Sequence, residues 1–592
     1  MKKNIGIILC LLLLCCCIFF VACGGAEQSG ETEASTQAGT DIAETEIPTQ
    51  AVTDHVETDP ETSAEATETE TQAPVTEEIT TEGEEIVTKA PITPIAFEEI
   101  KAVENLEAFI AEVDYENGEH NNEAKEVGAI LSPYFTMKIN GTDVACYAVR
   151  TAIGAHSFAM IDASEASFPL EIDLGVLTDY RKVTVLPEHY GVKAEKTEGG
   201  ATATVDRCGN YTFVLNGDKT KAITLFVRVE EAYAAPEGYE VIKIAPGVHN
   251  EKIEFTSEKQ VLYFEAGTHE LKYNITFKNN TEVYLERGAY IYATMPDMEE
   301  KPFLNPAWSG KVRWFALFQG QNVSNVRISG RGFIDLSRLD WHARSGIQFD
   351  LCQNITVEGV TINNCPEWTL YFTQSDHINV KDVMLFGYRQ NSDGIAIVDS
   401  GNALVKDCFA RSGDDLFEVK SMYGGCTVKI ENIVFDNCNA WPDKARGLGI
   451  IAETTRDMTD ITFRNCSVGF ASATWMEDLA GLVIYTEGPS KITQVTFENI
   501  ELYECDKYPI NVTVGDKSRA QISGLVFKDV AINGSKKIRI CNRSTVGGAI
   551  HGITFENCTR NGKLASTERI LNLAIDGVDE SKITIVAEDD AS

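Results

Sequence analysis

Three aspartates stand in two short polar segments that each precede an apolar run. Asp393 lies in NSDGIAIVDS (391–400), and Asp414 and Asp415 lie in SGDDLFEVKS (412–421). A third segment, ARGLGIIAE (445–453), places Arg446 in the same setting. Carboxylates that crowd together raise the pKa of at least one member, so a protonated acid stands beside ionised bases. Acid–base cleavage of a glycosidic bond requires that arrangement.

Imperfect repeats in the C-terminal half would bring these segments side by side. From about residue 244 the chain repeats units that end in Gly, Asp or Asn: ITVEG, INVKD, LVKD, VKIEN, ITFRN, VTFEN, LVFKD and ITFEN. The apolar residues two places before those ends recur after 23 to 34 residues, at Val357, Val380, Val405, Ile430, Phe463, Phe497, Phe527 and Phe555. Short β-branched runs broken by turn residues, stacked as repeats, predict a parallel β-helix over 244–592. Neighbouring strands lie ~4.8 Å apart, so the three aspartates and Arg446 should form one cluster.

Six cysteines keep fixed spacings from these repeat positions. Three follow them by three residues (Cys408, Cys466 and Cys558) and three by eight (Cys365, Cys438 and Cys505). Free cysteine packs as a small buried hydrophobe. We therefore expect a ladder of reduced thiols inside the coils, rather than disulfides or a metal site.

The N-terminus reads as an export signal followed by a linker. Two lysines precede an apolar run from Ile5 to Val21, and Cys23 follows among small residues, which is typical of a lipoprotein signal peptide (1–23) with lipid attached at Cys23. An uncleaved membrane anchor is the alternative. Either places the rest of the chain outside the cytoplasm, on the bacterial cell membrane or secreted. Residues 24–96 carry 18 acidic residues against one lysine and predict a disordered Thr/Glu-rich linker.

Two segments separate the linker from the repeats. Apolar residues spaced by three or four between Phe97 and Val113 predict an amphipathic helix within a segment at 97–130. Alternating runs within 131–243 predict a β-sandwich, with strands at 134–139, 168–172, 182–186, 211–215 and 223–227. The formal net charge of -38 disfavours nucleic acid as a partner and repels strongly anionic polymers at long range.

From about residue 244 to 562 the chain resembles the polygalacturonase-like glycoside hydrolases of family 28 and the related family 49 of dextranases and isopullulanase. The resemblance is carried by N-S-D-G at 391–394 and G-D-D at 413–415. It implies a right-handed β-helix, Asp414 as general acid, Asp393 and Asp415 as bases activating water, and inversion without a metal or cofactor. An inverting pair leaves ~6.5–9.5 Å between carboxyl groups for that water.

Two departures from the family 28 pattern bear on the substrate, which we expect to be a polysaccharide or oligosaccharide. Arg446 replaces the histidine of Gly-His-Gly, and Val483 and Tyr485 replace the two cations of Arg-Ile-Lys. Charge-assisted bonds bind uronate carboxylates, so a neutral glycan with dextranase-like cleavage is favoured, and a galacturonan or rhamnogalacturonan is the alternative. We expect Arg446 to keep the aspartates partly ionised. The predicted substrate-binding residues are Arg446, Asn391, Lys420, Gln390, Trp368 and Tyr485.

Two other functions fit the same residues. A β-helix polysaccharide lyase would use the aspartates to bind calcium. A non-catalytic surface protein that binds glycans would tolerate the change at Arg446. In a purely structural interpretation, the Asn, Asp and Gly residues are ordinary turn formers.

Overall fold

The computed structural model describes residues 91–110, 123–296 and 315–587. The predicted signal peptide, Cys23 and the linker up to residue 90 lie outside these described residues. All the described residues fall in one compact unit, Lys89–Ser592. Within the described part of the chain, no helix combines the length and the apolar character needed to cross a bilayer.

Residues 129–229 form two sheets that pack through one core. The larger sheet has the order β2-β5-β6-β12-β11-β8, with β1 paired to β6, and the smaller has the order β4-β3-β7-β10-β9. An apolar cluster joins Phe135 and Ile172 of the smaller sheet to Phe213 and Leu225 of the larger. The strands of the larger sheet are β1 (Thr93–Pro94), β2 (Ala129–Leu131), β5 (Tyr147–Thr151), β6 (Gly154–Ala163), β8 (Val183–Leu186), β11 (Gly209–Leu215) and β12 (Ala222–Val229). Those of the smaller are β3 (Phe135–Ile139), β4 (Thr142–Val144), β7 (Leu170–Val176), β9 (Glu195–Lys196) and β10 (Gly200–Val205).

The segment that precedes the sandwich differs from the prediction. Residues 91–96, assigned to the linker, are ordered, because β1 pairs with β6 and Ile95 is buried. The predicted helix is wrong over residues 97–105, since α1 spans only Leu106–Ile110. Phe97 instead lies buried among aromatic rings, and its backbone N–H donates to Tyr147 Oη at 2.8 Å. An irregular segment that buries every third or fourth side chain has the same spacing of apolar residues in the sequence as an amphipathic helix, which explains the wrong prediction.

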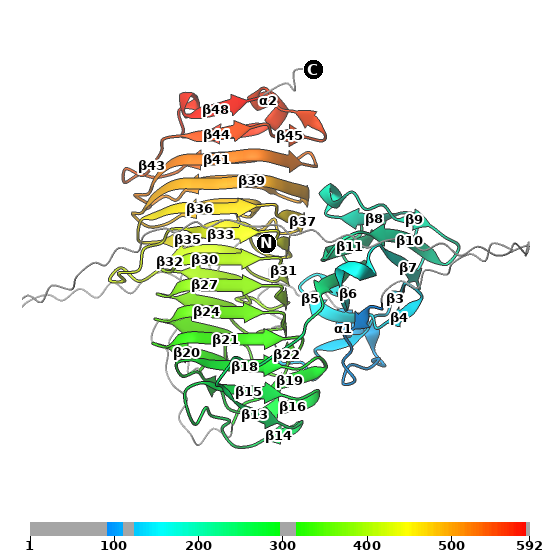
Figure 1. Ribbon diagram of the computed structural model, residues 1–592. Helices are drawn as coiled ribbons and strands as arrows, with labels where there is room; N and C mark the ends of the chain where they lie inside the picture. Colours follow the sequence, from blue (N-terminus) through cyan, green and yellow to red (C-terminus); the bar gives the residue numbers. More distant parts are fainter. Residues whose placement is uncertain (1–90, 111–122, 297–314, 588–592) are drawn as a thin grey trace, which may run out of the picture. The chain divides into compact units, whose positions relative to one another are not determined.

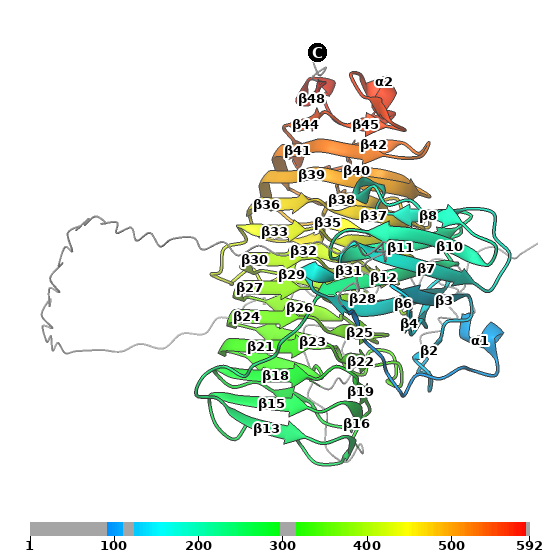
Figure 2. The same cartoon turned by 45° about the vertical axis from the view of Figure 1, so that its right-hand side comes forward.

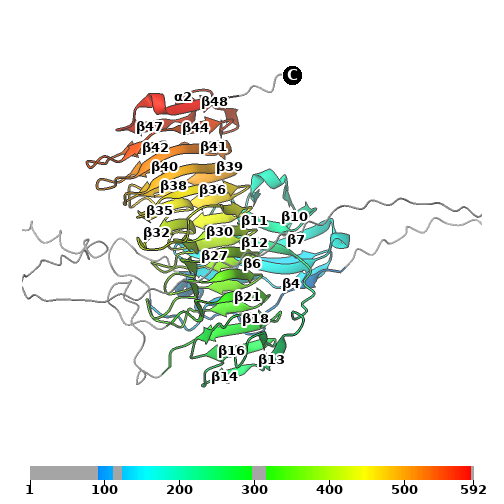
Figure 3. The same ribbon diagram turned by 60° about the vertical axis from the view of Figure 1, so that its left-hand side comes forward.

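A parallel β-helix follows, as predicted, and Figure 1 shows its strands stacked from β13 (Glu240–Ile244) to β48 (Ile583–Val586). One sheet of 25 strands supplies two faces of the coils, and an 11-stranded sheet supplies the third. Figure 2 shows several strands of both sheets in the same stack. The 11-stranded sheet contains β17 (Ile275–Thr276), β20 (Phe318–Gln321), β23 (Ile347–Asp350), β26 (Leu370–Thr373), β29 (Ile395–Val398), β32 (Phe417–Ser421), β35 (Leu448–Thr454), β38 (Ala480–Thr486), β40 (Tyr508–Val514), β42 (Ile538–Asn542) and β47 (Leu573–Asp576). Figure 3 shows the later members of this sheet in sequence, below the C-terminal helix α2 (Glu568–Leu571).

The repeat positions stack in register, with one correction. Val405 pairs with Phe435, and Phe435 pairs with Phe463, so Phe435 rather than Ile430 belongs to the series. The rings of Phe435 and Phe463 stack at 4.8 Å, as do those of Phe463 and Phe497. The misassignment has a physical cause, because Asn432 and Asn437 both adopt a positive φ, of 54°. Asn, Asp and Gly tolerate that conformation, so two turns of one coil carry the same signature.

The cysteines lie inside the coils as unpaired thiols. All eleven cysteines in the described ranges are free. Cys438 follows Phe435 by three residues and so shares its register with Cys408 and Cys466, not with the cysteines spaced by eight. Its backbone N–H donates to Cys466 Sγ at 3.4 Å. The predicted buried ladder is therefore present, with Cys438 moved to a different place in it.

The sandwich contacts the β-helix through a buried polar network near the predicted site. Arg411, on β31 (Phe409–Ser412), donates through Nη1 to His156 Nδ1 at 2.8 Å and through Nε to Asp443 Oδ1 at 3.1 Å. Burial lowers the pKa of His156 well below its usual range, and the charge of Arg411 adds to that effect. A neutral imidazole accepts at Nδ1 and donates at Nε2 to Thr224 Oγ1. Because Arg411 is three residues before Asp414, this network braces the strand that leads into the G-D-D loop.

Candidate active site

Consecutive coils bring the three polar segments together. Asp393 lies two residues before β29, Asp415 two residues before β32 with Asp414 beside it, and Arg446 two residues before β35. Ile395 pairs with Phe417, and Phe417 pairs with Leu448, so the three loops end at the same level. Gly394 is required there, since a Cβ at this position would lie 2.3 Å from the Leu416 carbonyl oxygen. The glycine of N-S-D-G thus lets the G-D-D coil pass close beside it.

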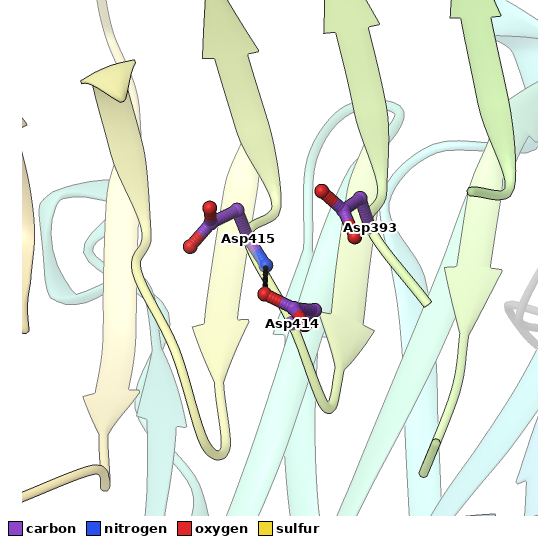
Figure 4. A group of neighbouring side chains, drawn as sticks. All are labelled: Asp393, Asp414 and Asp415. Carbon is purple, nitrogen blue, oxygen red and sulfur yellow. Dashed lines mark hydrogen bonds between the residues drawn. The ribbon is translucent and has the colours of Figure 1, made fainter. Parts of the chain in front are cut away.

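The three aspartates form a compact carboxyl cluster (Figure 4). Each contributes one oxygen to a set whose members all lie within 4.8 Å of one another. This is closer than the ~6.5–9.5 Å expected for an inverting pair, so the predicted separation does not hold for the nearest oxygens. Asp393 and Asp415 are each 3% exposed, whereas Asp414 is half-buried and is the accessible member.

Asp414 is held by backbone donors on both oxygens. The N–H of Asn391 donates to Oδ2 at 2.8 Å, and the N–H of Asp415 donates to Oδ1 at 3.0 Å. Burial raises the pKa of Asp414 well above its usual range, and the charges of Asp393 and Asp415 raise it further. An oriented, accessible carboxyl with a raised pKa is suited to carry a proton and release it.

Arg446 neutralises Asp415. Its Nη1 donates to both oxygens of Asp415, at 3.1 and 3.0 Å, and its backbone N–H donates to Oδ1 at 3.1 Å. Its Nη2 pairs with Asp478, from the loop between β37 (Ser467–Ala471) and β38. Burial lowers the pKa of the Arg446 guanidinium, but the charges of Asp415 and Asp478 raise it by more, so the net shift is upward. Arg446 therefore orients the Asp415 carboxylate through charge-assisted hydrogen bonds.

Lys420 serves Asp393 in the same way. Lys420 Nζ lies 3.3 Å from Asp393 Oδ2 and 3.8 Å from Asp415 Oδ2. It also lies 2.9 Å from Glu418 and 3.8 Å from Glu453. Burial raises the pKa of Asp393 well above its usual range, while Lys420 opposes that shift. Three carboxylate oxygens at this spacing could also hold a cation, but Lys420 and Arg446 already supply positive charge to Asp393 and Asp415.

The remaining predicted residues divide between the site and its support. Asn391 reaches His342 through its amide oxygen at 2.9 Å, and the Gln390 carbonyl accepts from Trp341 Nε1 at 2.9 Å. Trp368 is 4% exposed, and the Lys420 ammonium lies 5.0 Å from its ring centroid, so its predicted contact with substrate stays a prediction. The Tyr485 ring lies 5.8 Å from the Arg446 guanidinium, beside the cluster.

Sequence reasoning missed two charged groups of the site. Glu418 is an acidic residue inside the strand-forming run LFEVKS, and this exception to the apolar pattern is the signal that could have identified it. Asp478 had no signal of its own, because it belongs to an irregular loop whose path the repeat does not specify. The same loop is tied down by Trp475 Nε1, which donates to the Lys444 carbonyl at 2.7 Å.

Comparisons with known proteins agree with this architecture. Residues 271–514 match the model of glycosyl hydrolases family 28. The chain is 21% identical over 280 residues to polygalacturonase QRT2 of Arabidopsis thaliana, covering 43% of this chain and 61% of that protein. It is 22% identical over 200 residues to a polygalacturonase of Juniperus ashei, covering 31% and 37%. The chain thus spans less than two thirds of the length of these relatives.

Among solved structures, Dex49A from Penicillium minioluteum superimposes with a TM-score of 0.56 at 13% identity, covering 81% of this chain and 98% of that one. At that identity the likeness concerns the fold alone. The predicted resemblance is confirmed where the sequence matches: residues 271–514 carry the pattern of glycosyl hydrolases family 28 on a parallel β-helix.

Proposed function

We propose that the chain is a glycoside hydrolase of the polygalacturonase type, with Asp414 as general acid and Asp393 and Asp415 as bases. One observation carries the proposal: Asp414, the accessible carboxyl with a raised pKa, lies among two buried carboxylates that each have their own cation. The family 28 match over the same residues supports it.

The geometry assigns each group a step. Asp414 gives its proton to the leaving glycosidic oxygen, while Asp393 or Asp415 takes a proton from the attacking water. Lys420 and Arg446 place a positive charge within 4 Å of Asp393 and Asp415 respectively, and Lys420 opposes the burial that raises the pKa of Asp393. Inversion of the anomeric centre is proposed from the family resemblance, since the nearest carboxyl oxygens lie closer than the general rule for inverting enzymes.

The proposed substrate is a galacturonan or rhamnogalacturonan. The matched relatives in Arabidopsis thaliana and Juniperus ashei, both named polygalacturonases, support this class over the dextranase-like cleavage favoured by the sequence pattern. A neutral glycan is the second candidate, and a specific observation favours it. Val483 is 1% exposed and Tyr485 is a phenol, so the positions of the two family cations provide no positive charge.

A substrate panel tests the proposal. Purified protein would be incubated with polygalacturonate, rhamnogalacturonan, dextran and pullulan, and newly formed reducing ends would be counted. Asp414→Asn should lower turnover by about 10²–10⁴-fold, because it removes the acid while keeping the shape. Asp407→Asn is the matched control: the same substitution on a turn outside the site, where the new amide oxygen still accepts from Asn437 Nδ2.

Three outcomes separate the alternatives. Reducing ends whose first anomer, followed by NMR, is inverted support the full proposal. Unsaturated products that absorb in the ultraviolet, lost on calcium chelation, would instead establish a lyase. Glycan binding without any product, unchanged in Asp414→Asn, would leave a binding protein.

We also propose that the chain is exported and anchored by a lipid on Cys23. The support is the sequence of residues 1–23 alone. Metabolic labelling with a palmitate analogue should mark the wild-type protein and not Cys23→Ala, and label on both would refute the anchor.

A further inference from the structure

Glu418 is a fully buried carboxyl on the strand that follows the G-D-D loop. On β32, Phe417 and Val419 point into the core, so Glu418 and Lys420 lie on the opposite face with the site. Glu418 is 0% exposed. Burying an acid at this position is costly unless a partner compensates for it.

The neighbouring coils leave room for this side chain. Glu418 pairs with Ala396 on the preceding coil and with Gly449 on the following one, and neither carries a side chain beyond Cβ. The glutamate can therefore fold along the strand toward Lys420. Lys420 Nζ lies 2.9 Å from Glu418, which is nearer than Asp393, Asp415 or Glu453.

We propose that Glu418 is a positioning residue: its carboxyl group holds the Lys420 ammonium between Asp393 and Asp415, and thereby tunes the pH dependence of the base Asp393. This rests on the proposed function of the three aspartates. Glu418 itself touches no reacting atom in that scheme.

The charges that face Lys420 explain the effect. They come from its own strand (Glu418), the preceding loops (Asp393 and Asp415) and the next coil (Glu453). Burial raises the pKa of Glu418 to about 8, with Lys420 opposing the shift and Asp415 adding to it. An ionised Glu418 also raises the pKa of Asp393. Below pH ~8 the protonated Glu418 leaves more of the Lys420 charge to Asp393.

The first test is the pH dependence of kcat/KM in Glu418→Gln, which keeps the shape and removes the ionisation. Asp393 must be ionised to act as a base, so activity rises as the pH passes its pKa. Glu418 carries its negative charge only above pH ~8, so the profiles of wild type and Glu418→Gln should converge below that pH. Above it, Glu418→Gln should complete the rise at lower pH, by about one unit. Glu418→Ala, which frees Lys420, should lower kcat more than it changes KM. Glu431→Gln, at a half-buried position just before β33 (Ile433–Asp436) and outside the site, is the matched control and should leave the profile in place.

The second test needs no catalysis. A carboxyl whose folded pKa is raised stabilises the fold while protonated, and this contribution is lost as pH rises from the unfolded pKa to the folded one. The melting temperature of wild type should therefore fall relative to Glu418→Gln between pH 4.5 and about 8, then run parallel above that range. A wild type inactive on every substrate would refute the proposed function and leave this melting result standing. Coincident pH–rate profiles for wild type and Glu418→Gln, in an active enzyme, would overturn the positioning role.

Discussion

Replacing Arg446 with alanine should damage stability and catalysis together. The guanidinium is buried and pairs with both Asp415 and Asp478, so its removal strips Asp478 of this cation and leaves Asp415 only the more distant Lys420, at 3.8 Å. Breaking a buried ion pair by removing one partner costs about 3–5 kcal/mol. The entropy of unfolding is ~2.1 cal/mol/K per residue, which gives about 1 kcal/mol/K for roughly 500 residues that unfold together. The melting temperature should therefore fall by about 3–5 °C at pH 7.

Calorimetry and initial rates test this expectation together. Turnover should fall by about 10²-fold, since Asp415 loses the bonds that orient it. Arg456→Ala is the matched control: it pairs with buried Asp399 at 2.8 Å outside the site and should cost stability while kcat/KM is kept. If Arg446→Ala melts within 1 °C of wild type and retains its turnover, the bidentate pair has no role in either property.

Four further predictions follow from the same contacts. The raised pKa of Asp414 keeps the acid protonated above the usual carboxyl range, so kcat should decline as pH rises through that pKa; a rate that climbs steadily into alkaline pH would exclude this acid. Phe463→Ala removes a buried ring stacked on two others and should cost about 3–5 kcal/mol in calorimetry, whereas Phe463→Leu should cost less. Burial raises the pKa of the Cys438 thiol well above its usual range, so alkylation followed by mass spectrometry should mark it only after unfolding; rapid labelling of the native protein would contradict the reduced ladder. Methyl-esterified galacturonan should be turned over faster than the free acid at low salt, because the site already holds excess negative charge that repels a free uronate. Salt screens that repulsion, so the difference in rate should shrink as the salt concentration rises. Equal rates for the two substrates at every salt concentration would contradict this charge argument.

The repeat could be predicted because its signals are local. A residue that must adopt a positive φ is most often Asn, Asp or Gly, and the apolar residue two places earlier must fill the coil. Both constraints are therefore visible in the amino-acid sequence of each repeat unit. The prediction was wrong at Ile430 because Asn432 and Asn437 both adopt a positive φ, so either asparagine could end the repeat unit. Only the register across coils, which is a long-range property, distinguishes the two turns.

The cluster of the three aspartates was predictable for a similar reason, while their charged partners were not. Asp393, Asp414 and Asp415 occupy loops immediately before strands, so stacking alone brings them together. Asp478 reaches Arg446 from an irregular loop, and the path of that loop depends on contacts such as Trp475 with the Lys444 carbonyl. The helix predicted at 97–113 failed at its start because burial between the sandwich and the β-helix outweighed the weak helical preference of nine residues.

Charge balance links the unusual Arg446 to both acid strength and substrate. Two cations, Lys420 and Arg446, stand among more carboxyl groups than they can neutralise. Those carboxyl groups are Asp393, Asp414, Asp415, Glu418, Glu453 and Asp478. The excess favours protons on the least compensated members, which is why a buried acid can stay protonated beside its bases. It also means that both cations are already engaged with protein carboxylates, so a uronate at this point would meet repulsion rather than a salt bridge. Binding of a galacturonan must therefore come from hydroxyl contacts, from ester groups that hide the charge, or from sugars placed away from this cluster.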